Sequence, residues 1–158
     1  MNVNDKAALT VAIDEFDEFF AAVNHGREPY AWQRALLRQV VTTGRWPDAV
    51  VAPTGAGKSS VLEVHVFAVA MTHAPGWEGA RAPRRLWHVV GRRALVDDMA
   101  SRAEGVFDQL AEITDVPGEA PLSRVAAALR RISPAGQPGS VTTLRGGIAP
   151  ERGWQDDP

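Results

Sequence analysis

The chain of 158 residues contains no cysteine, which excludes disulfides, thiolate metal sites and cysteine nucleophiles. It also lacks a long apolar run. The most apolar stretch, residues 61–71, contains Glu63 and His65 and is too short and too polar to span a bilayer. The polar N-terminus has no apolar core of a signal peptide. These absences, with 45% hydrophobic and 23% charged residues, predict a globular cytoplasmic protein without a membrane segment.

Lysine is nearly absent as well. Of the 17 basic residues only two are lysines, Lys6 and Lys58. Because the chain otherwise uses arginine, the lysine at position 58 indicates a site that needs a compact ammonium rather than a planar guanidinium. The arginines are also unevenly placed: residues 81–102 contain six of them against Asp97 and Asp98. Such a basic segment is compatible with a nucleic-acid backbone as partner.

Lys58 belongs to a glycine-rich run between a predicted strand, residues 48–52, and a predicted helix, residues 59–71. This order suits a phosphate-cradling loop, because glycines let backbone amides turn toward one centre at the positive end of a helix dipole. We expect the Lys58 ammonium, as the catalytic residue, to reach the β- and γ-phosphates of a nucleotide and the Ser59 hydroxyl to bind Mg²⁺. Amides of Gly55, Gly57 and Lys58 would hold the phosphates. The predicted nucleotide-binding residues of the loop are Pro53, Thr54, Gly55, Ala56, Gly57, Lys58 and Ser59.

The rest of the chain alternates helical patterns with short apolar or β-branched runs. Apolar residues recur at helical spacing in residues 14–24, 32–43, 94–110 and 122–132. Residues 85–90 and 140–144 read as two further strands. Strands that alternate with helices predict parallel βαβ units, so the expected fold class is α/β with a parallel sheet flanked by helices.

These pieces, in this order, resemble the first RecA-like lobe of a superfamily 2 helicase, whose usual loop form, Ala-x-Thr-Gly-x-Gly-Lys-Ser/Thr, is met by residues 52–59. The resemblance implies an incomplete P-loop NTPase lobe over residues 29–158, preceded by an N-terminal helical segment over residues 1–28. It implies that Gln33 reads the adenine base. The residues implied to contact the DNA backbone are Arg92, Arg93, Gly146 and Gly147.

A finer resemblance is to the CRISPR-associated helicase of type I systems, which acts in antiviral defence. It is carried by the run Arg84-Arg85-Leu86-Trp87-His88-Val89-Val90-Gly91-Arg92-Arg93-Ala94-Leu95-Val96-Asp97, and by Leu144-Arg145-Gly146-Gly147 followed by Trp154 and Asp157-Pro158. It implies ATP-driven translocation on single-stranded DNA, with a guide-RNA surveillance complex as a further partner.

Parts of such an enzyme are missing from the sequence. No apolar strand with an Asp-Glu box follows Gly147, and no second lobe or His-Asp nuclease site is present. We therefore expect a truncated helicase that binds ATP and hydrolyses little or none of it. Two alternatives remain: a small P-loop kinase, disfavoured by the long segment before the loop, and a non-catalytic P-loop module that docks onto a partner. Trp32 and Tyr30 either stack on adenine or pack onto the core. Arg130 and Arg131 are interpreted as a solvated helix face.

Overall fold

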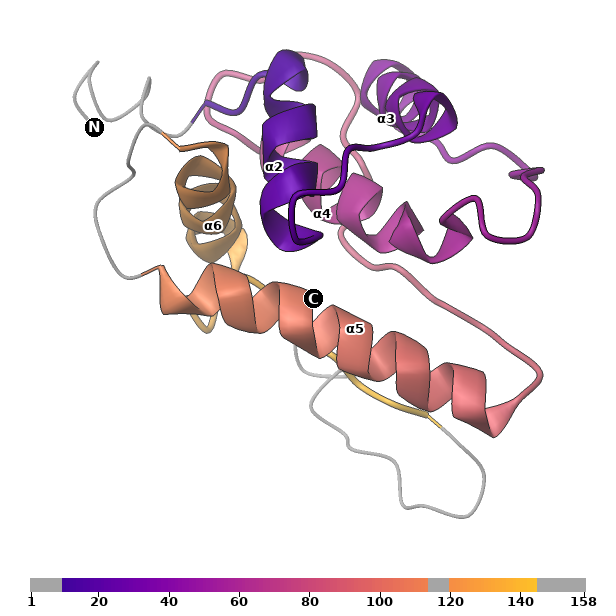
Figure 1. Cartoon of the computed structure of the whole chain (residues 1–158). Coiled ribbons are helices and arrows are strands. Elements are labelled where there is room, and N and C mark those ends of the chain that lie inside the picture. Colours follow the sequence, from indigo (N-terminus) through magenta and orange to yellow (C-terminus); the bar gives the residue numbers. More distant parts are fainter. Residues whose placement is uncertain (1–9, 114–119, 145–158) are drawn as a thin grey trace.

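The computed structural model describes residues 10–113 and 120–144, which form helices joined by extended connections (Figure 1). The elements are η1 (Ile13–Glu15), α2 (Phe16–Val23), α3 (Ala31–Thr43), η2 (Lys58–Ser60), α4 (Val61–Thr72), α5 (Arg93–Glu112) and α6 (Pro121–Ile132). Every helix predicted from apolar spacing is confirmed, with bounds that differ by one or two residues.

The predicted α/β fold class is wrong. None of residues 48–52, 85–90 and 140–144 forms a strand, and residues 10–113 and 120–144 contain no sheet. The interpretation as a RecA-like P-loop lobe, with a parallel sheet flanked by helices, is corrected with it. The physical reason is that a strand obtains its backbone hydrogen bonds only from a neighbouring strand, whereas a helix closes them internally. Here the β-branched runs stay extended, and the helices bury their apolar faces against one another.

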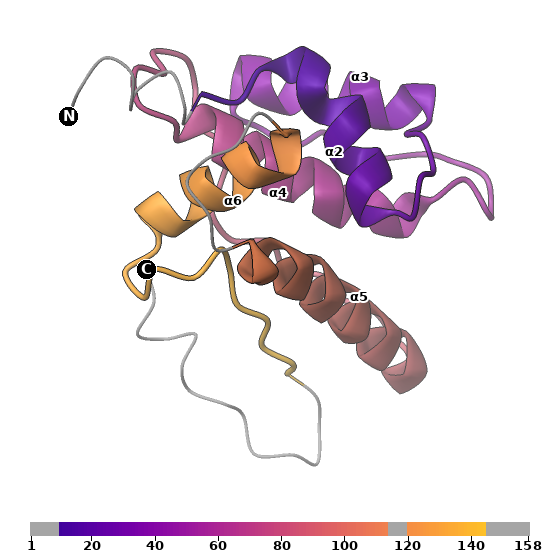
Figure 2. The same ribbon diagram turned by 60° about the vertical axis from the view of Figure 1, so that its left-hand side comes forward.

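Helix α4 is the centre of the core. Its side chains from Leu62 to Ala70 are all buried, so it needs neighbours on every side. Helices α3 and α6 pack against it, and α2 contributes the rings of Phe16 and Phe19, whose centroids each lie 5.3 Å from that of Phe67. Figure 2 shows α2, α3 and α4 as one group with α6 beside it. The predicted division after residue 28 stays a prediction, although α2 shares this core.

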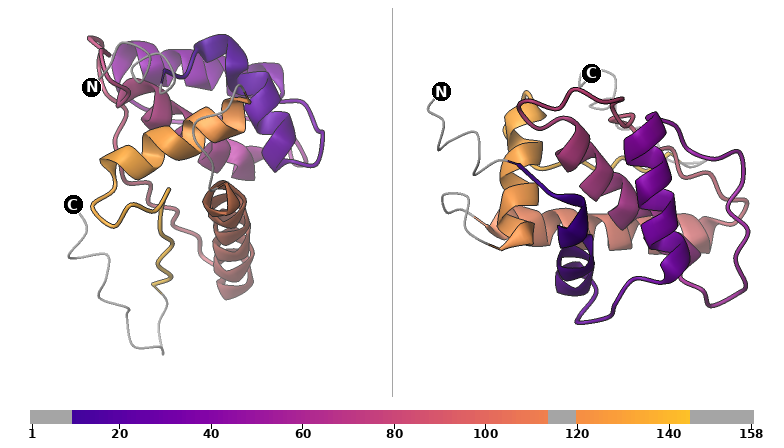
Figure 3. Two further views of the ribbon diagram at one scale, coloured as in Figure 1. Left: turned by 90° about the vertical axis from the view of Figure 1, so that its left-hand side faces the viewer. Right: turned by 90° about the horizontal axis from the view of Figure 1, so that it is seen from above.

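Helix α5 lies apart from α2 and α3, and the left panel of Figure 3 shows it nearly end-on. Its two buried side chains, Val106 and Leu110, are both in its second half. The guanidinium of Arg130 on α6 donates to the carbonyls of Leu110 and Ala111, at 2.8 and 2.9 Å. Those terminal carbonyls have no partner within their own helix. Arg130 therefore caps α5, and the interpretation of a solvated face is wrong for it.

An ion pair with a buried carboxylate connects α4 with α5. Glu63, which has no exposed surface, pairs with the guanidinium of Arg102. The same guanidinium donates to the side-chain oxygen of Asn24 at 2.8 Å. Burial raises the pKa of Glu63, and the charge of Arg102 opposes that effect. Because the buried Glu63 carboxylate would be costly to leave without a partner, the pair fixes α5 against the core.

Across residues 10–113 and 120–144, no helix has both the length and the apolar character that crossing a lipid bilayer requires.

Candidate functional site

The glycine-rich loop lies directly before α4. Gly55 and Gly57 have φ angles of +83° and +70°, in the left-handed region that glycine adopts without strain. The turn η2 begins at Lys58 and continues into α4. The predicted order of loop and helix is thus present, whereas the preceding segment is extended chain in which the side chain of Val51 is 96% exposed.

Helix α3 holds the loop through two neighbouring side chains in its first turn. The indole N–H of Trp32 donates to the carbonyl of Ala56 at 2.9 Å. The side-chain amide of Gln33 donates to the carbonyl of Gly57 at 3.3 Å and to the hydroxyl of Ser60. Two consecutive loop carbonyls therefore point toward α3.

This arrangement also fixes the direction of the loop amides. In a planar trans peptide the C=O and N–H groups point in opposite directions, and the described residues contain no cis peptide. Because the carbonyls of Ala56 and Gly57 face α3, the N–H groups of Gly57 and Lys58 face away from it.

Residues 57–59 have the backbone conformation of a nest, a motif whose convergent N–H groups suit an anion. Gly57 is left-handed and Lys58 is helical, and this alternation makes successive N–H groups converge on one point. No residue in the described part of the chain accepts a hydrogen bond from the amides of Gly57, Lys58 or Ser59. By contrast, the amide of Ala56 donates to the carbonyl of Pro53 at 3.2 Å. The nest thus offers convergent donors at a helix N-terminus, where the dipole favours an anion.

The Lys58 ammonium lies across the loop. It donates to the carbonyls of Ala52 and Pro53, both at 2.8 Å, and the residue is exposed. An ammonium has three N–H donors, so two such bonds leave one for an incoming anion. The charge is therefore held beside the nest by the loop itself.

Gln33, predicted to read adenine, is used here to shape the loop. Gln33 is only 1% exposed. Its side-chain oxygen accepts a hydrogen bond from the backbone N–H of Tyr30 at 2.6 Å, and its side-chain nitrogen donates to the Gly57 carbonyl and the Ser60 hydroxyl. Base reading by Gln33 stays a prediction. The sequence reasoning did not find the loop contacts of Trp32 and Ser60, because no periodicity or spacing relates residues so far apart along the chain.

A second aromatic side chain next to the loop, besides that of Trp32, is that of Tyr30. It is 54% exposed, and a Cβ placed on Gly57 would lie 3.3 Å from its ring. An exposed aromatic ring in this position has the flat apolar face that a stacking partner such as a base would need.

The predicted nucleic-acid residues are only partly described. Arg92 and Arg93 are exposed at the N-terminal end of α5, where the carbonyl of Arg92 accepts the amides of Leu95 and Val96. No hydrogen bond or ion pair connects either arginine with residues 52–60. Gly146 and Gly147 lie outside the described residues.

A metal ion at the loop would depend mainly on the ligand it accompanies. Within residues 10–113 and 120–144, no group of three or more His, Asp or Glu side chains is placed so that it could hold a metal ion. The hydroxyl of Ser59 is half-buried in the first helical turn after the nest, and a hydroxyl oxygen suits Mg²⁺ as one ligand among phosphate and water oxygens.

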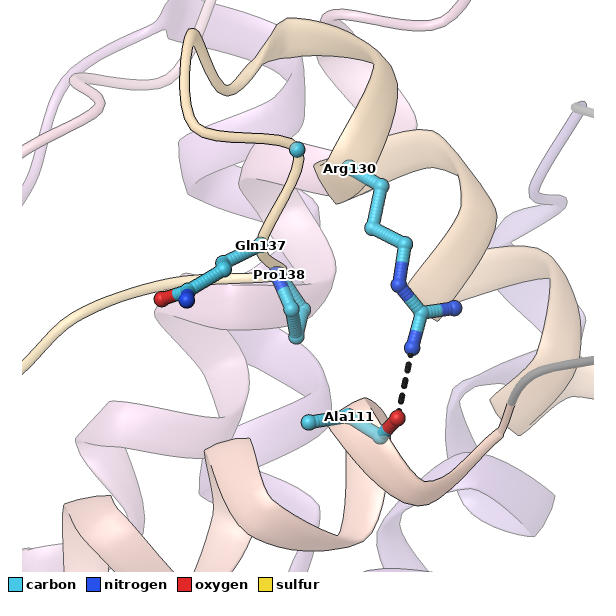
Figure 4. Close-up of a pocket in the computed structure, with 5 residues that line it drawn as sticks. Ala111, Arg130, Gln137 and Pro138 are labelled. Carbon is cyan, nitrogen blue, oxygen red and sulfur yellow. Dashed lines mark hydrogen bonds between the residues drawn. The ribbon is translucent and has the colours of Figure 1, made fainter.

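A separate shallow pocket lies between the end of α5 and the segment after α6 (Figure 4). It is lined by Ala111, Arg130, Gly136, Gln137 and Pro138, none of which belongs to the loop. The guanidinium of Arg130 already bonds to two carbonyls of α5. The loop is the better candidate site, because its convergent donors have no protein acceptor.

The chain matches no protein-family model, curated protein or solved structure with which it was compared.

Proposed function

We propose that residues 52–60 bind the phosphate groups of ATP. The observation that carries the proposal is the nest at Gly57, Lys58 and Ser59, whose convergent amides have no acceptor among the described residues and lie beside the Lys58 ammonium. Successive N–H donors at a helix start, together with a lysine, match the charge and geometry of a phosphate chain.

Each part of the loop then has a role. The three amides bind phosphate oxygens, and Lys58 uses its remaining N–H on the outer phosphates. Ser59 supplies an oxygen to Mg²⁺, which would neutralise part of the phosphate charge when bound. The exposed ring of Tyr30 beside Gly57 favours a nucleotide over inorganic phosphate, because it offers a stacking surface for the base.

The wider assignment is an ATP-binding portion of a DNA helicase or translocase similar to the type I CRISPR helicase, acting in the cytoplasm with a guide-RNA surveillance complex. It is supported by the loop sequence and by residues 84–97, and not by the fold. Single-stranded DNA is the proposed polymer partner. Arg92 and Arg93 place two cations at the positive end of α5, whose first turn has no acidic residue, and a backbone phosphate would relieve that repulsion.

Titration of the chain with MgATP by calorimetry tests the proposal. We expect Lys58→Ala to weaken binding about tenfold or more, since a charge-assisted bond to phosphate is lost. The matched control is Lys6→Ala, which removes the same charge outside the loop and should bind like the parent. Equal affinities of the parent and Lys58→Ala would contradict ATP binding at the loop.

Two further measurements separate the alternatives. Transfer of a phosphoryl group from ATP to a small acceptor would favour the kinase. Association of the chain that depends on its concentration and is unaffected by ATP would favour the docking module.

A further inference from the structure

We infer that Trp32 is a positioning residue of this site: its indole N–H holds the Ala56 carbonyl and thereby turns the Gly57 amide toward bound phosphate. The inference rests on the proposed function and adds a residue to it that acts through the loop and not by touching the nucleotide.

The geometry gives Trp32 a task that Gln33 cannot share. The bond from Trp32 fixes the peptide between Ala56 and Gly57, whereas Gln33 fixes the next peptide, between Gly57 and Lys58. A free peptide at either position could rotate and turn its N–H out of the nest. Both bonds are therefore needed for two consecutive amides to converge.

The setting of Trp32 suits this role. The ring is half-buried and packs against the hydrophobic core, so its indole N–H is held in place by α3. A tryptophan anchored in this way loses little freedom when it bonds to the loop, because it has only two side-chain torsions and the core already restrains them. The loop thus meets a donor that is already in position.

A matched control lies in the connection after α4. The indole N–H of Trp77 also donates to a loop carbonyl, that of Ala80, at 2.9 Å. Replacing either tryptophan by phenylalanine removes one indole donor and keeps an aromatic ring. Trp32→Phe and Trp77→Phe therefore differ in which loop loses its bond.

The test measures binding of two probes, inorganic tripolyphosphate and ATP, each with Mg²⁺, to the full chain. We expect Trp32→Phe to weaken both probes by the same factor, about fivefold, which is the usual net effect of one neutral hydrogen bond. Trp77→Phe should bind both like the parent.

The two probes separate positioning from stacking. If Trp32 stacked on adenine, Trp32→Phe would change ATP binding and leave tripolyphosphate unchanged, which would overturn the inference. Unchanged binding of both probes would overturn it as well. A parent chain that binds neither probe would overturn the proposed function itself, and this result is distinct because it does not involve the variant.

A second measurement uses the parent chain, so that it does not depend on how well the variant folds. The chain has five tryptophans, and the indole N–H signal of Trp32 can be assigned in its nuclear magnetic resonance spectrum by through-bond and through-space connectivities. We expect tripolyphosphate to shift this signal and slow its exchange with water, while the Trp77 signal stays in place. If the indole N–H signal of Trp32 keeps its chemical shift and exchange rate while the probe is bound, positioning of the loop through Ala56 is contradicted.

Discussion

The connections on either side of α4 have opposite characters. Before α4, residues 52–57 are rich in glycine and are held by the side chains of α3, which bond to consecutive carbonyls. After α4, residues 85–91 are extended and carry the exposed side chains of Trp87 and Val89, which are 60% and 88% exposed. Residues 88–91 make no backbone–backbone hydrogen bond to another residue of the described chain.

The difference shows what each kind of segment needs. A glycine loop can be ordered by a few side-chain donors from one helix, because only its carbonyls have to be fixed. An extended apolar segment needs a neighbouring strand for its backbone and a covering layer for its side chains. The later connection is held at its start by two side-chain bonds: His73 bonds to the carbonyl of Ala82 at 2.9 Å, and Arg84 donates to that of Ile132 at 2.7 Å.

The largest effect is expected where α4 contacts this later connection, at His65. Its ring is 6% exposed, lies 3.4 Å from the carbonyl of Arg84 and has its Nδ1 buried without a partner. Burial lowers the pKa of His65 from 6.5 to about 4. Below pH 6.5 the His65 imidazole therefore becomes protonated in the unfolded chain, whereas in the folded chain it stays neutral down to about pH 4.

This single group should make the free energy of unfolding fall by about 3 kcal/mol as the pH drops from 6.5 to 4, and level off below. The measurement is chemical denaturation across that range for the parent and His65→Leu. The variant should lack this component. Because burial raises the pKa of Glu63, protonation of that carboxyl makes the folded chain more stable as the pH falls, which opposes the effect of His65. The test therefore compares the difference in the free energy of unfolding between the parent and His65→Leu at each pH. Parallel profiles would contradict the buried neutral imidazole.

The second prediction compares a glycine from each connection. Gly57→Ala should lower the free energy of unfolding by about 1–2 kcal/mol, because alanine is strained in the left-handed region. Its Cβ would also lie 3.1 Å from the side-chain nitrogen of Gln33. Gly91→Ala meets nothing within 4 Å and should stay within about 0.5 kcal/mol of the parent. Thermal unfolding measures both, and equal losses would break the comparison.

The smallest effect is expected at Val89. Because its side chain is 88% exposed, Val89→Ser should change the free energy of unfolding by less than about 0.5 kcal/mol. Val64→Ser, at a side chain with no exposed surface, is the contrasting variant and should cost several times more. A large loss from Val89→Ser would mean that residues 85–91 are covered in solution.

Helices were the predictable part of the fold. Apolar residues at helical spacing identified α2, α3, α5 and α6, because this periodicity reports directly which face of a helix is buried. The prediction of strands was wrong for a related reason. Residues 48–52 and 85–90 have the composition of strands, but composition does not say whether a partner strand lies alongside.

The site was predictable only at its centre. Gly55, Gly57 and Lys58 stand out in the sequence because left-handed turns favour glycine and because lysine is otherwise so rare. The contacts of Trp32 with Ala56 and of Gln33 with Gly57 join residues 24 positions apart, and no local pattern predicts such pairs. Only the packing of α3 beside the loop brings them together.

The most direct test of the central claim is to follow backbone amide signals of the full chain while tripolyphosphate is added with Mg²⁺. The account predicts that the amides of Gly57, Lys58 and Ser59 shift most and saturate together, while that of Gly91 stays in place. Saturating shifts confined to residues around Arg92 and Arg93, or no saturating shift at residues 57–59, would contradict a phosphate nest at the start of α4.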